Sequence, residues 1–409
     1  MEKIALHSVV VTIGTTRSGK TTWCERMFPP GEILSVDNLR LELTGDSRNF
    51  TQDRSVWAEL HRRARLMTEM GQRVVVDAPN LKSQDREPFA RLAEDLGVPV
   101  CYVLFDPSLE DKKQQPGVNL YLLQKQHQTL QTELKHILKG DGYRIPVIRN
   151  VDQVSVAQRQ ATPPNRLLVV GDVHGDFANM EKAVTHAREN GLFLVFLGDV
   201  IDYGAHNLKC MKLAYQCVAE NQAHMIWGNH ERKIDRWIHS DWGKHYRGRL
   251  SEANLATIRE IESLNSERRA RFLSAWRALA NWSTQHLVVS DWLFTHGAAS
   301  PDMWNTQAHR LVGDMGNLAY FGEVDERDPT RADGYPNRVW NWVNSVPKGK
   351  TVVVGHDWLD RDKFEPVVKT NSQGGQVIAL DTGNGKGGVL SALELDTQTN
   401  QYRILKFTG

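Results

Sequence analysis

Apolar residues in the first 150 positions fall into short runs separated by longer amphipathic stretches. The runs Ser8–Ile13, Val74–Val76 and Val100–Phe105 are rich in β-branched residues, and a polar or helix-like pattern follows each of them. Strands that alternate with helices are typical of a parallel sheet, because parallel strands need crossover connections. We therefore expect the first part of the chain to be an α/β domain.

The polar stretch from Val151 to Pro164 interrupts this rhythm and ends in two prolines, which predicts a domain boundary. Six further runs are typical of strands: Leu167–Val170, Leu192–Leu197, Ala223–Trp227, His286–Thr295, Thr351–Val354 and Gln376–Leu380. An arginine-rich helical insert lies between Glu231 and Gln285. The 409 residues are enough for two cores, and we expect domains at residues 1–158 and 166–409.

Composition narrows the class of protein only slightly. No CxxC pair occurs among the four cysteines, which is typical of reduced thiols in a cytoplasmic protein. No stretch approaches the roughly 18 apolar residues that a membrane span needs. We therefore expect a cytoplasmic location, whereas a net charge of +1 neither requires nor excludes nucleic acid.

The segment GTTRSGKT at residues 14–21 follows the first strand and opens a helix-like run, so it fits GxxxxGK[ST] in its required context. Glycines let backbone N–H groups face phosphate oxygens, Lys20 can reach the β and γ phosphates, and Thr21 can ligate Mg²⁺. The pattern predicts ATP binding by Gly14, Thr15, Thr16, Arg17, Ser18, Gly19, Lys20, Thr21 and Thr22.

A phosphate-binding loop does not by itself distinguish a kinase from a hydrolase. Asp37 follows the strand-like EILSV, where a carboxylate could accept the proton of an attacking hydroxyl, and Arg40 one turn later could hold an acceptor phosphate. We therefore expect Lys20, Asp37 and Arg40 to be catalytic. The alternative is that Asp37 caps a helix and Arg40 is a surface charge.

This order of loop, Asp-x-x-Arg and the strand VVVDAPN resembles the 5′-hydroxyl polynucleotide kinases of phages and of bacterial RNA repair. The resemblance covers about residues 8–150, with Pro79 where those kinases have threonine. Their lid arginines correspond here to Lys112 and Lys113, which the resemblance assigns to the ATP phosphates. A solvated run of charges is the alternative.

The second part carries five short motifs, each directly after an expected strand: GDVHGD at 171–176, GDVIDYG at 198–204, GNHE at 228–231, THG at 295–297 and GH at 355–356. Side chains at neighbouring strand ends meet at one edge of a sheet. Carboxylate, amide and imidazole donors together suit two divalent ions that share a carboxylate. The sequence therefore predicts a binuclear metal site.

The motif series resembles the calcineurin-like metallophosphoesterases over residues 166–409. The two resemblances together imply an α/β chain. A P-loop NTPase-type parallel sheet with helices on both faces precedes a β-sandwich flanked by helices. The implied ligands are Asp172 and His174 at the first ion, Asp199 between the ions, and Asn229, His296 and His356 at the second. His230 would be the general acid or a donor to the transition state, oriented by Asp202, and the ions would be Mn²⁺ or similar.

Two features bear on the subfamily. The segment IALDTGNGKGG at 378–388 resembles one in bacterial polynucleotide kinase-phosphatases and in diadenosine tetraphosphatases, which makes Asp381 either a ligand or a turn carboxylate. Tyr203 stands where GDxxDRG normally has an arginine that grips phosphate, and Arg232 or Arg331 could replace it.

The order of the two modules resembles bacterial polynucleotide kinase-phosphatase without its ligase. The resemblance implies an ATP- and Mg²⁺-dependent 5′-hydroxyl kinase and a 3′-phosphatase, extending to 2′,3′-cyclic phosphates, that act on RNA or DNA ends before a separate RNA ligase. Tryptophans among the arginines of residues 227–304 either stack bases or fill the core. The alternative function is a diadenosine polyphosphate or phosphoprotein phosphatase with a small-molecule kinase or nucleotide-sensing P-loop domain.

Overall fold

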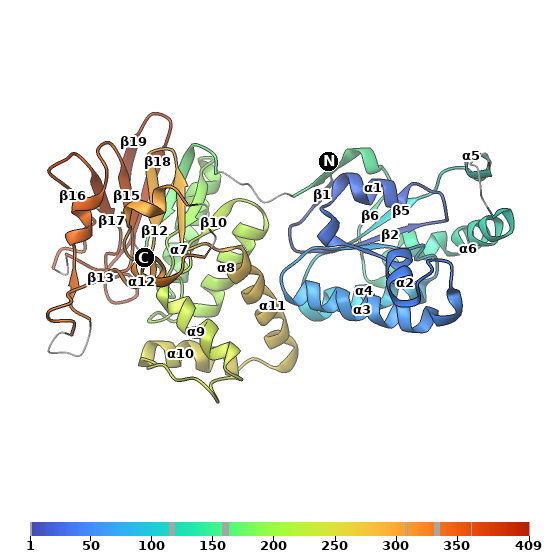
Figure 1. Ribbon diagram of the computed structural model, residues 1–409, viewed down its shortest axis with the longest axis horizontal. Helices are drawn as coiled ribbons and strands as arrows, with labels where there is room; N and C mark the ends of the chain where they lie inside the picture. The colour runs from blue at the N-terminus through green and yellow to red at the C-terminus, as the bar shows by residue number, and fades with distance from the viewer. Residues whose placement is uncertain are drawn as a thin grey trace. The chain divides into compact units, whose positions relative to one another are not determined.

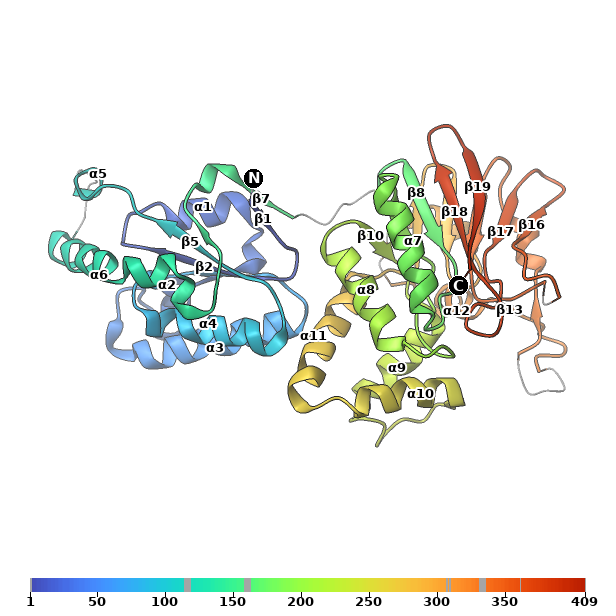
Figure 2. The same ribbon diagram turned by 180° about the vertical axis from the view of Figure 1, so that it is seen from behind.

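The computed structural model describes residues 2–113, 119–157, 163–306, 308, 310–330, 336–360 and 362–408. It divides into two compact units, Met1–Arg159 with Ser266–Asn281 and Gln160–Asn265 with Trp282–Gly409 (Figures 1 and 2). Arg331 lies outside the described residues, and the side chain of Lys113 is not described. The sequence analysis placed all of 166–409 in one domain, whereas helix α11 (Ser266–Trp282) joins the first unit almost entirely.

The first unit is built on a parallel sheet of five strands in the order β3-β4-β2-β5-β6. The strands are β2 (Val9–Gly14), β3 (Ile33–Ser35), β4 (Val74–Asp77), β5 (Val100–Phe105) and β6 (Val147–Ile148). The helices are α1 (Lys20–Met27), α2 (Val36–Thr44), α3 (Asp53–Glu69), α4 (Ser83–Leu96), α5 (Leu109–Lys113) and α6 (Leu120–Leu138). A short ribbon of β1 (Glu2–Ile4) and β7 (Val154–Val156) completes the unit.

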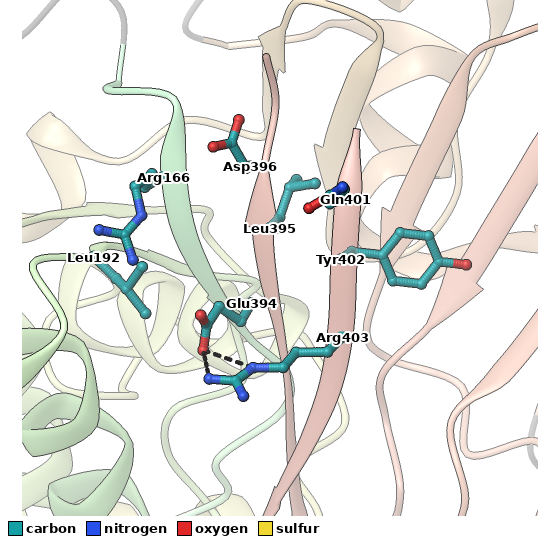
Figure 3. Close-up of a pocket in the computed structure, with 8 residues that line it drawn as sticks. All are labelled: Arg166, Leu192, Glu394, Leu395, Asp396, Gln401, Tyr402 and Arg403. Carbon is teal, nitrogen blue, oxygen red and sulfur yellow. Dashed lines mark hydrogen bonds and ion pairs between the residues drawn. The ribbon is translucent and has the colours of Figure 1, made fainter. Parts of the chain in front are cut away.

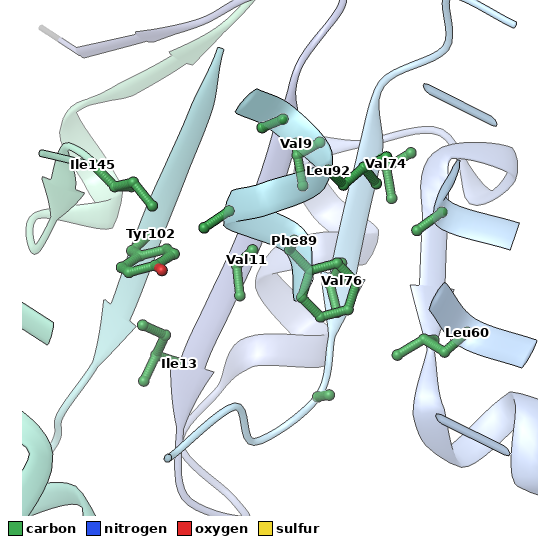
Figure 4. Close-up of a cluster of buried hydrophobic side chains, with 14 of the residues drawn as sticks. Val9, Val11, Ile13, Leu60, Val74, Val76, Phe89, Leu92, Tyr102 and Ile145 are labelled. Atoms are coloured by element: carbon green, nitrogen blue, oxygen red, sulfur yellow. The ribbon is translucent and has the colours of Figure 1, made fainter. Parts of the chain in front are cut away.

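The central strand β2 is buried on both faces, as its unbroken apolar run predicts. Val9, Val11 and Ile13 pack with residues of α3 and α4, such as Leu60 and Phe89, in the core drawn in Figure 4. The intervening residue Val10 packs on the opposite face, in the cluster that includes residues of α1. This two-sided burial fixes the carboxyl end of β2, where the phosphate-binding loop begins.

Helix α11 packs closely against the end of α3. An added Cβ on Gly71 would lie 2.2 Å from the Cα of Ala278, so only glycine permits this approach. The side-chain amide of Asn281 donates a hydrogen bond to the carbonyl of Met70 (2.6 Å). These contacts explain why α11 belongs to the first unit although it follows the insert in sequence.

The second unit is a sandwich of two five-stranded sheets, ordered β10-β9-β8-β18-β19 and β11-β12-β15-β17-β16. The strands of these sheets are β8 (Arg166–Val170), β9 (Phe193–Phe196), β10 (Ala223–Met225), β11 (His286–Val289), β12 (Trp292–Thr295), β15 (Thr351–Val354), β16 (Val367–Thr370), β17 (Gln376–Ala379), β18 (Leu390–Asp396) and β19 (Gln401–Phe407). Val169 and Val195 of one sheet pack with Phe294, Val353 and Ile378 of the other.

Helices flank this sandwich, as the resemblance implies. They are α7 (Phe177–Glu189), α8 (Asn207–Ala219), α9 (Asn229–His239), α10 (Glu252–Glu262) and α12 (Gly313–Phe321), and a small ribbon pairs β13 (Glu323–Val324) with β14 (Arg338–Val339). The expected single strand His286–Thr295 is instead the hairpin β11–β12, because Ser290 turns the chain with a φ of 54°. None of the described helices is long and apolar enough to span a membrane.

Four of the tryptophans between positions 227 and 304 are buried, namely Trp227, Trp237, Trp276 and Trp292. They fill the core, so the base-stacking alternative is wrong for these four. A shallow hollow of about 240 Å³ lies on the sheet that contains β18 and β19, where Arg403 is paired with Glu394 at 2.7 Å (Figure 3). None of the expected metal ligands lines this hollow, so it is not the catalytic site.

Candidate metal centre and nucleotide site

The expected metal ligands come from six strand ends. They follow β8, β9, β10, β12, β15 and β17, and the side chains of the three aspartates Asp172, Asp199 and Asp381 are buried. Glycines before two ligands allow this crowding, since a Cβ on Gly355 would lie 2.1 Å from Asp172 Oδ1 and one on Gly228 would lie 2.3 Å from Asp199 Oδ1. The sequence analysis expected these ends at one edge of a single sheet, but β8, β9 and β10 belong to one sheet of the sandwich and β12, β15 and β17 to the other, so the expected ligands come from both sheets.

The donor atoms form two groups that share Asp199. One group consists of His174, Asp199 and His230, and the other of Asp199, His296 and His356, each with its donor atoms within 4.8 Å of one another. His296 Nε2 lies 2.9 Å from Asn229 Oδ1 and 3.0 Å from His356 Nδ1. Asp172 lies beside the first group, with an oxygen 3.9 Å from His174 Nε2. A carboxylate common to both groups is the arrangement that two bridged ions require.

The electrostatics of these residues fit divalent cations. Burial raises the pKa of Asp172 well above its ordinary value, with a further contribution from Asp381. Burial also raises the pKa of Asp381, whose Oδ2 is buried and has no hydrogen-bond partner among the described residues. Burial alone would raise the pKa of Asp199, but His296 and His230 hold it well below its usual range. Buried carboxylates gathered in this way need positive charge.

His230 is held by a network that extends into the helical insert. Its Nδ1 is hydrogen-bonded to the buried Asp202, and its Nε2 faces the metal centre, 3.7 Å from Asp199 Oδ2. Asp202 also accepts hydrogen bonds from Asn254 and Thr257 of α10. The sequence analysis predicted the contact with Asp202 but missed Asn254 and Thr257. The one local signal in this segment was the helix cap that Ser251 forms with Asn254.

The loops of the site hold non-glycine residues in the left-handed region. His174, Asp199, Asp202, Tyr203 and His356 have φ values between 48° and 74°. Such backbone is costly for these residue types, and it persists only where the surroundings fix it. Glu231 provides part of that support, because its buried carboxylate accepts hydrogen bonds from the backbone of Asp199 and Val200. Burial and Asp199 raise the pKa of Glu231 to about 7.

A lysine lies beside Tyr203, the residue that stands where the GDxxDRG motif normally has an arginine. The ammonium of Lys386 lies 4.2 Å from the ring centre of Tyr203 and 3.1 Å from His174 Nε2. Burial, followed by the charge of Lys386, lowers the pKa of His174 well below its ordinary value. Lys386 lies in the segment 378–388 that also contains Asp381, but the sequence analysis did not identify Lys386 as a site residue. The guanidinium of Arg232, one of the two arginines expected to replace the family arginine, lies over the rings of Tyr320 and Phe321.

The phosphate-binding loop has its expected form. Lys20 donates hydrogen bonds to the carbonyls of Gly14 (3.0 Å) and Thr15 (2.8 Å), and burial lowers its pKa to about 8 against the opposing charge of Asp77. Thr21 donates to Asp77 at 2.9 Å. A hydroxyl and a carboxylate in this pairing are the usual protein ligands of nucleotide-bound Mg²⁺. Asp77, in the VVVDAPN strand, therefore joins the predicted site.

Asp37 and Arg40 form a pair beside this loop. Ser35 caps α2, so the alternative that Asp37 is the cap is wrong. Arg40 is buried rather than a surface charge, and its guanidinium contacts Asp37 (2.6 Å) and Asp53 (3.0 Å). The carboxylate of Asp37 is largely exposed, yet it acts on the pKa of Lys20. Asp37 thus lies open to solvent near the phosphate site.

Lys112 is the second lysine that we expected to contact the ATP phosphates. Its side chain is buried, and its ammonium has no hydrogen-bond partner in the described part of the chain. Burial lowers its pKa, and its charge contributes to lowering that of Lys20. The alternative of a solvated charge is therefore wrong for Lys112, and an unpaired ammonium here suits a phosphate.

Known families match both modules. The calcineurin-like phosphoesterase family matches residues 165–373, which is just over half of the 409 residues. The chain therefore belongs to the calcineurin-like phosphoesterase family and is a phosphoesterase whose fold implies divalent metal ions. An AAA-domain family matches residues 9–116, so a P-loop domain precedes the phosphoesterase.

Relatives bear names from nucleotide metabolism. Bis(5′-nucleosyl)-tetraphosphatase PrpE of Oceanobacillus iheyensis is 31% identical over 242 residues, covering 55% of this chain and 86% of the relative. The protein of that name from Halalkalibacterium halodurans is 24% identical over 237 residues, covering 55% and 88%. A solved metallophosphoesterase from Sphaerobacter thermophilus has 16% identity and a TM-score of 0.33, covering 59% of this chain and 88% of that chain.

Proposed function

We propose that the chain repairs nucleic-acid ends, with an ATP-dependent 5′-hydroxyl kinase in the first unit and a metal-dependent 3′-phosphatase in the second. The observation that carries the proposal is the position of Asp37, whose exposed carboxylate lies two residues after Ser35. Ser35 pairs in the sheet with Asp77, which accepts the hydrogen bond of Thr21. Transfer of a phosphate to a hydroxyl needs a base that the acceptor can reach, whereas a nucleotide sensor does not.

In the kinase site, Lys20 and Lys112 would contact the ATP phosphates, and Thr21 with Asp77 would hold Mg²⁺. When bound there, Mg²⁺ would supply positive charge to the phosphates. Asp37 would take the proton of the 5′-hydroxyl. Arg40 holds Asp37 through the ion pair at 2.6 Å, so we assign it first to positioning that base.

In the phosphatase site, the side chains around Asp199 would hold two ions, for which we propose Mn²⁺ because imidazole donors suit it. Such ions polarise the phosphate and activate the attacking water. His230 would donate a proton from Nε2 to the leaving oxygen, since Asp202 holds Nδ1. Lys386 would bind phosphate oxygens in place of the arginine absent at position 203. A 2′,3′-cyclic phosphate also has nonbridging oxygens that the ions could hold and an ester oxygen that His230 could protonate.

A second candidate function is hydrolysis of dinucleoside polyphosphates. The specific support for it is that both relatives named above are bis(5′-nucleosyl)-tetraphosphatases. Hydrolysis of either substrate requires the same ions and proton donor. The acceptor base Asp37 favours end repair. Action on RNA ahead of DNA, and upstream of a separate ligase, rests on the resemblance to bacterial polynucleotide kinase-phosphatases.

Transfer of label from γ-³²P-ATP to 5′-hydroxyl RNA and DNA oligonucleotides tests the proposal. We expect Asp37→Asn to abolish transfer, because it removes the base. Asp53→Asn is the matched control: it also removes a carboxylate from Arg40, and the loss should be far smaller. Equal loss in both variants, or no transfer by the wild type, would refute the kinase assignment.

A further inference from the structure

A basic pocket of about 500 Å³ lies in the second unit between α9, α12 and the loop that precedes α12. None of the expected metal ligands lines it. Its charged and aromatic lining consists of Arg232, Asp235, Arg236, Arg310, Trp227 and Tyr320. Neither the family match nor the relatives assign a role to these residues.

The pocket adjoins the metal centre through two segments. Trp227 lies two residues before Asn229, where α9 begins. On the other side, the guanidinium of Arg232 lies 5.0 Å from the ring centre of Tyr320 and 5.4 Å from that of Phe321. The carbonyl of Phe321 is hydrogen-bonded to His356 Nε2 (3.2 Å). The pocket wall is therefore continuous with a metal ligand, so one extended molecule could reach both.

The pocket is built for an anion. Arg232 and Arg236 are four residues apart on α9, so they project from the same face of the helix. Within the described residues neither has an ion pair with a carboxylate, and Asp235 lies 3.5 Å from His239 Nδ1. Guanidinium groups match the geometry of phosphate oxygens and bind them through paired N–H donors.

The opposite wall is held close by a glycine. A Cβ on Gly316 would lie 2.7 Å from the carbonyl oxygen of Leu311, the residue that follows Arg310. The backbone N–H of Leu311 is also bonded to the buried side chain of Gln285. Leu311 is therefore fixed against α12, and the neighbouring Arg310 lines the pocket together with the two arginines of α9.

We propose that this pocket binds a second phosphate of the same substrate whose reacting phosphate is held at the metal centre. That phosphate is the neighbouring phosphodiester of a nucleic acid or a further phosphate of a dinucleoside polyphosphate. The proposal deepens the proposed function and rests on it, because a simple monoester has no such group. It makes the three arginines determinants of specificity.

Kinetics test this proposal through a ratio, kcat/KM for a substrate with a second phosphate divided by that for p-nitrophenyl phosphate. In Arg236→Ala and Arg310→Ala we expect the ratio to fall about tenfold or more, as loss of a charge-assisted hydrogen bond predicts. Arg259→Ala, on the outer insert helix α10, is the control and should leave the ratio unchanged. A fall with a 3′-phosphorylated oligonucleotide identifies a phosphodiester, and a fall with diadenosine tetraphosphate identifies a polyphosphate. An unchanged ratio for both refutes the proposal.

A binding measurement keeps the proposal separate from the catalytic assignment. Inorganic tripolyphosphate is titrated calorimetrically into the EDTA-treated full chain, in a Lys20→Ala background that removes the nucleotide site. We expect binding that Arg236→Ala with Arg310→Ala weakens about tenfold or more, and that Arg236→Lys weakens less. No binding, or equal binding in the double variant, refutes the pocket. Absence of hydrolysis of every substrate would instead refute the proposed function.

Discussion

Replacement of Lys386 by alanine tests how this phosphatase compensates for Tyr203. The ammonium lies 3.1 Å from His174 Nε2 and 4.2 Å from the centre of the tyrosine ring, so it is the cation beside the position of the missing arginine. A phosphate held by the metal centre would leave oxygens facing this lysine, and charge develops on them in the transition state. We therefore expect Lys386→Ala to impair hydrolysis directly.

The magnitude follows from charge, distance and exposure. Two unit charges 4 Å apart near a protein surface interact by about 4 kcal/mol. Lys386 is exposed, and solvent screens it, so we take about half of that, roughly 2 kcal/mol. This corresponds to a loss of about thirtyfold in kcat/KM. It lies below the roughly 2.7–4 kcal/mol reported for a preorganised donor in a dry site.

Steady-state hydrolysis of p-nitrophenyl phosphate at saturating metal is the assay. Lys386→Arg should retain most activity, and Tyr203→Arg should restore activity to Lys386→Ala by returning the family cation. The metal concentration at half-maximal activity should fall in Lys386→Ala, because an ammonium beside His174 repels a cation. Activity of Lys386→Ala within threefold of wild type, or no rescue by Tyr203→Arg, would refute this reasoning.

Four further outcomes are expected. Lys20→Ala should abolish phosphate transfer and spare hydrolysis, while Asp172→Ala does the reverse; loss of both activities in either folded variant would contradict separate sites. Hydrolysis should stop after chelation and return with Mn²⁺ rather than Mg²⁺, as metal titration would measure. Burial lowers the pKa of His7 to about 4, so the unfolded chain binds a proton below about pH 6.5 that the folded chain does not. The free energy of unfolding should therefore fall by about 2 kcal/mol between about pH 6.5 and about pH 5. Urea unfolding of His7→Gln should show no such fall. Arg86→Ala leaves the buried carboxylate of Asp141 without its ion-pair partner, so the free energy of unfolding measured in urea should fall by about 3–5 kcal/mol.

Motifs that are local in sequence predicted most of both sites. The loop around Lys20 and the expected ligand Asp199 each follow a strand, so their motifs could be recognised without knowing the topology. That the metal-site strands belong to two sheets could not be predicted, because no single motif contains residues from both. Lys386 was missed because its role depends on Tyr203, far away in sequence. Asn254 was missed because it lies in an insert that no motif connects to the metal centre.

The arrangement of secondary structure was predicted less completely. The single strand expected at His286–Thr295 turns back at Ser290. The polar pair Ser290-Asp291 interrupts the apolar run and favours a turn, but the segment has no glycine or proline, and the sequence analysis did not recognise the turn. Helix α11 joins the first unit through the close contact of Gly71 with Ala278. A steric fit between residues two hundred positions apart leaves no local pattern in either segment.

One oligonucleotide with a 5′-hydroxyl and a 3′-phosphate tests the central claim most directly. It is incubated with γ-³²P-ATP, Mg²⁺ and Mn²⁺, and both ends are analysed after electrophoresis. The account predicts that label appears at the 5′ end, that the 3′-phosphate is released, and that an RNA ligase can then join the product. The claim is contradicted if both ends remain unchanged while the same preparation cleaves diadenosine tetraphosphate.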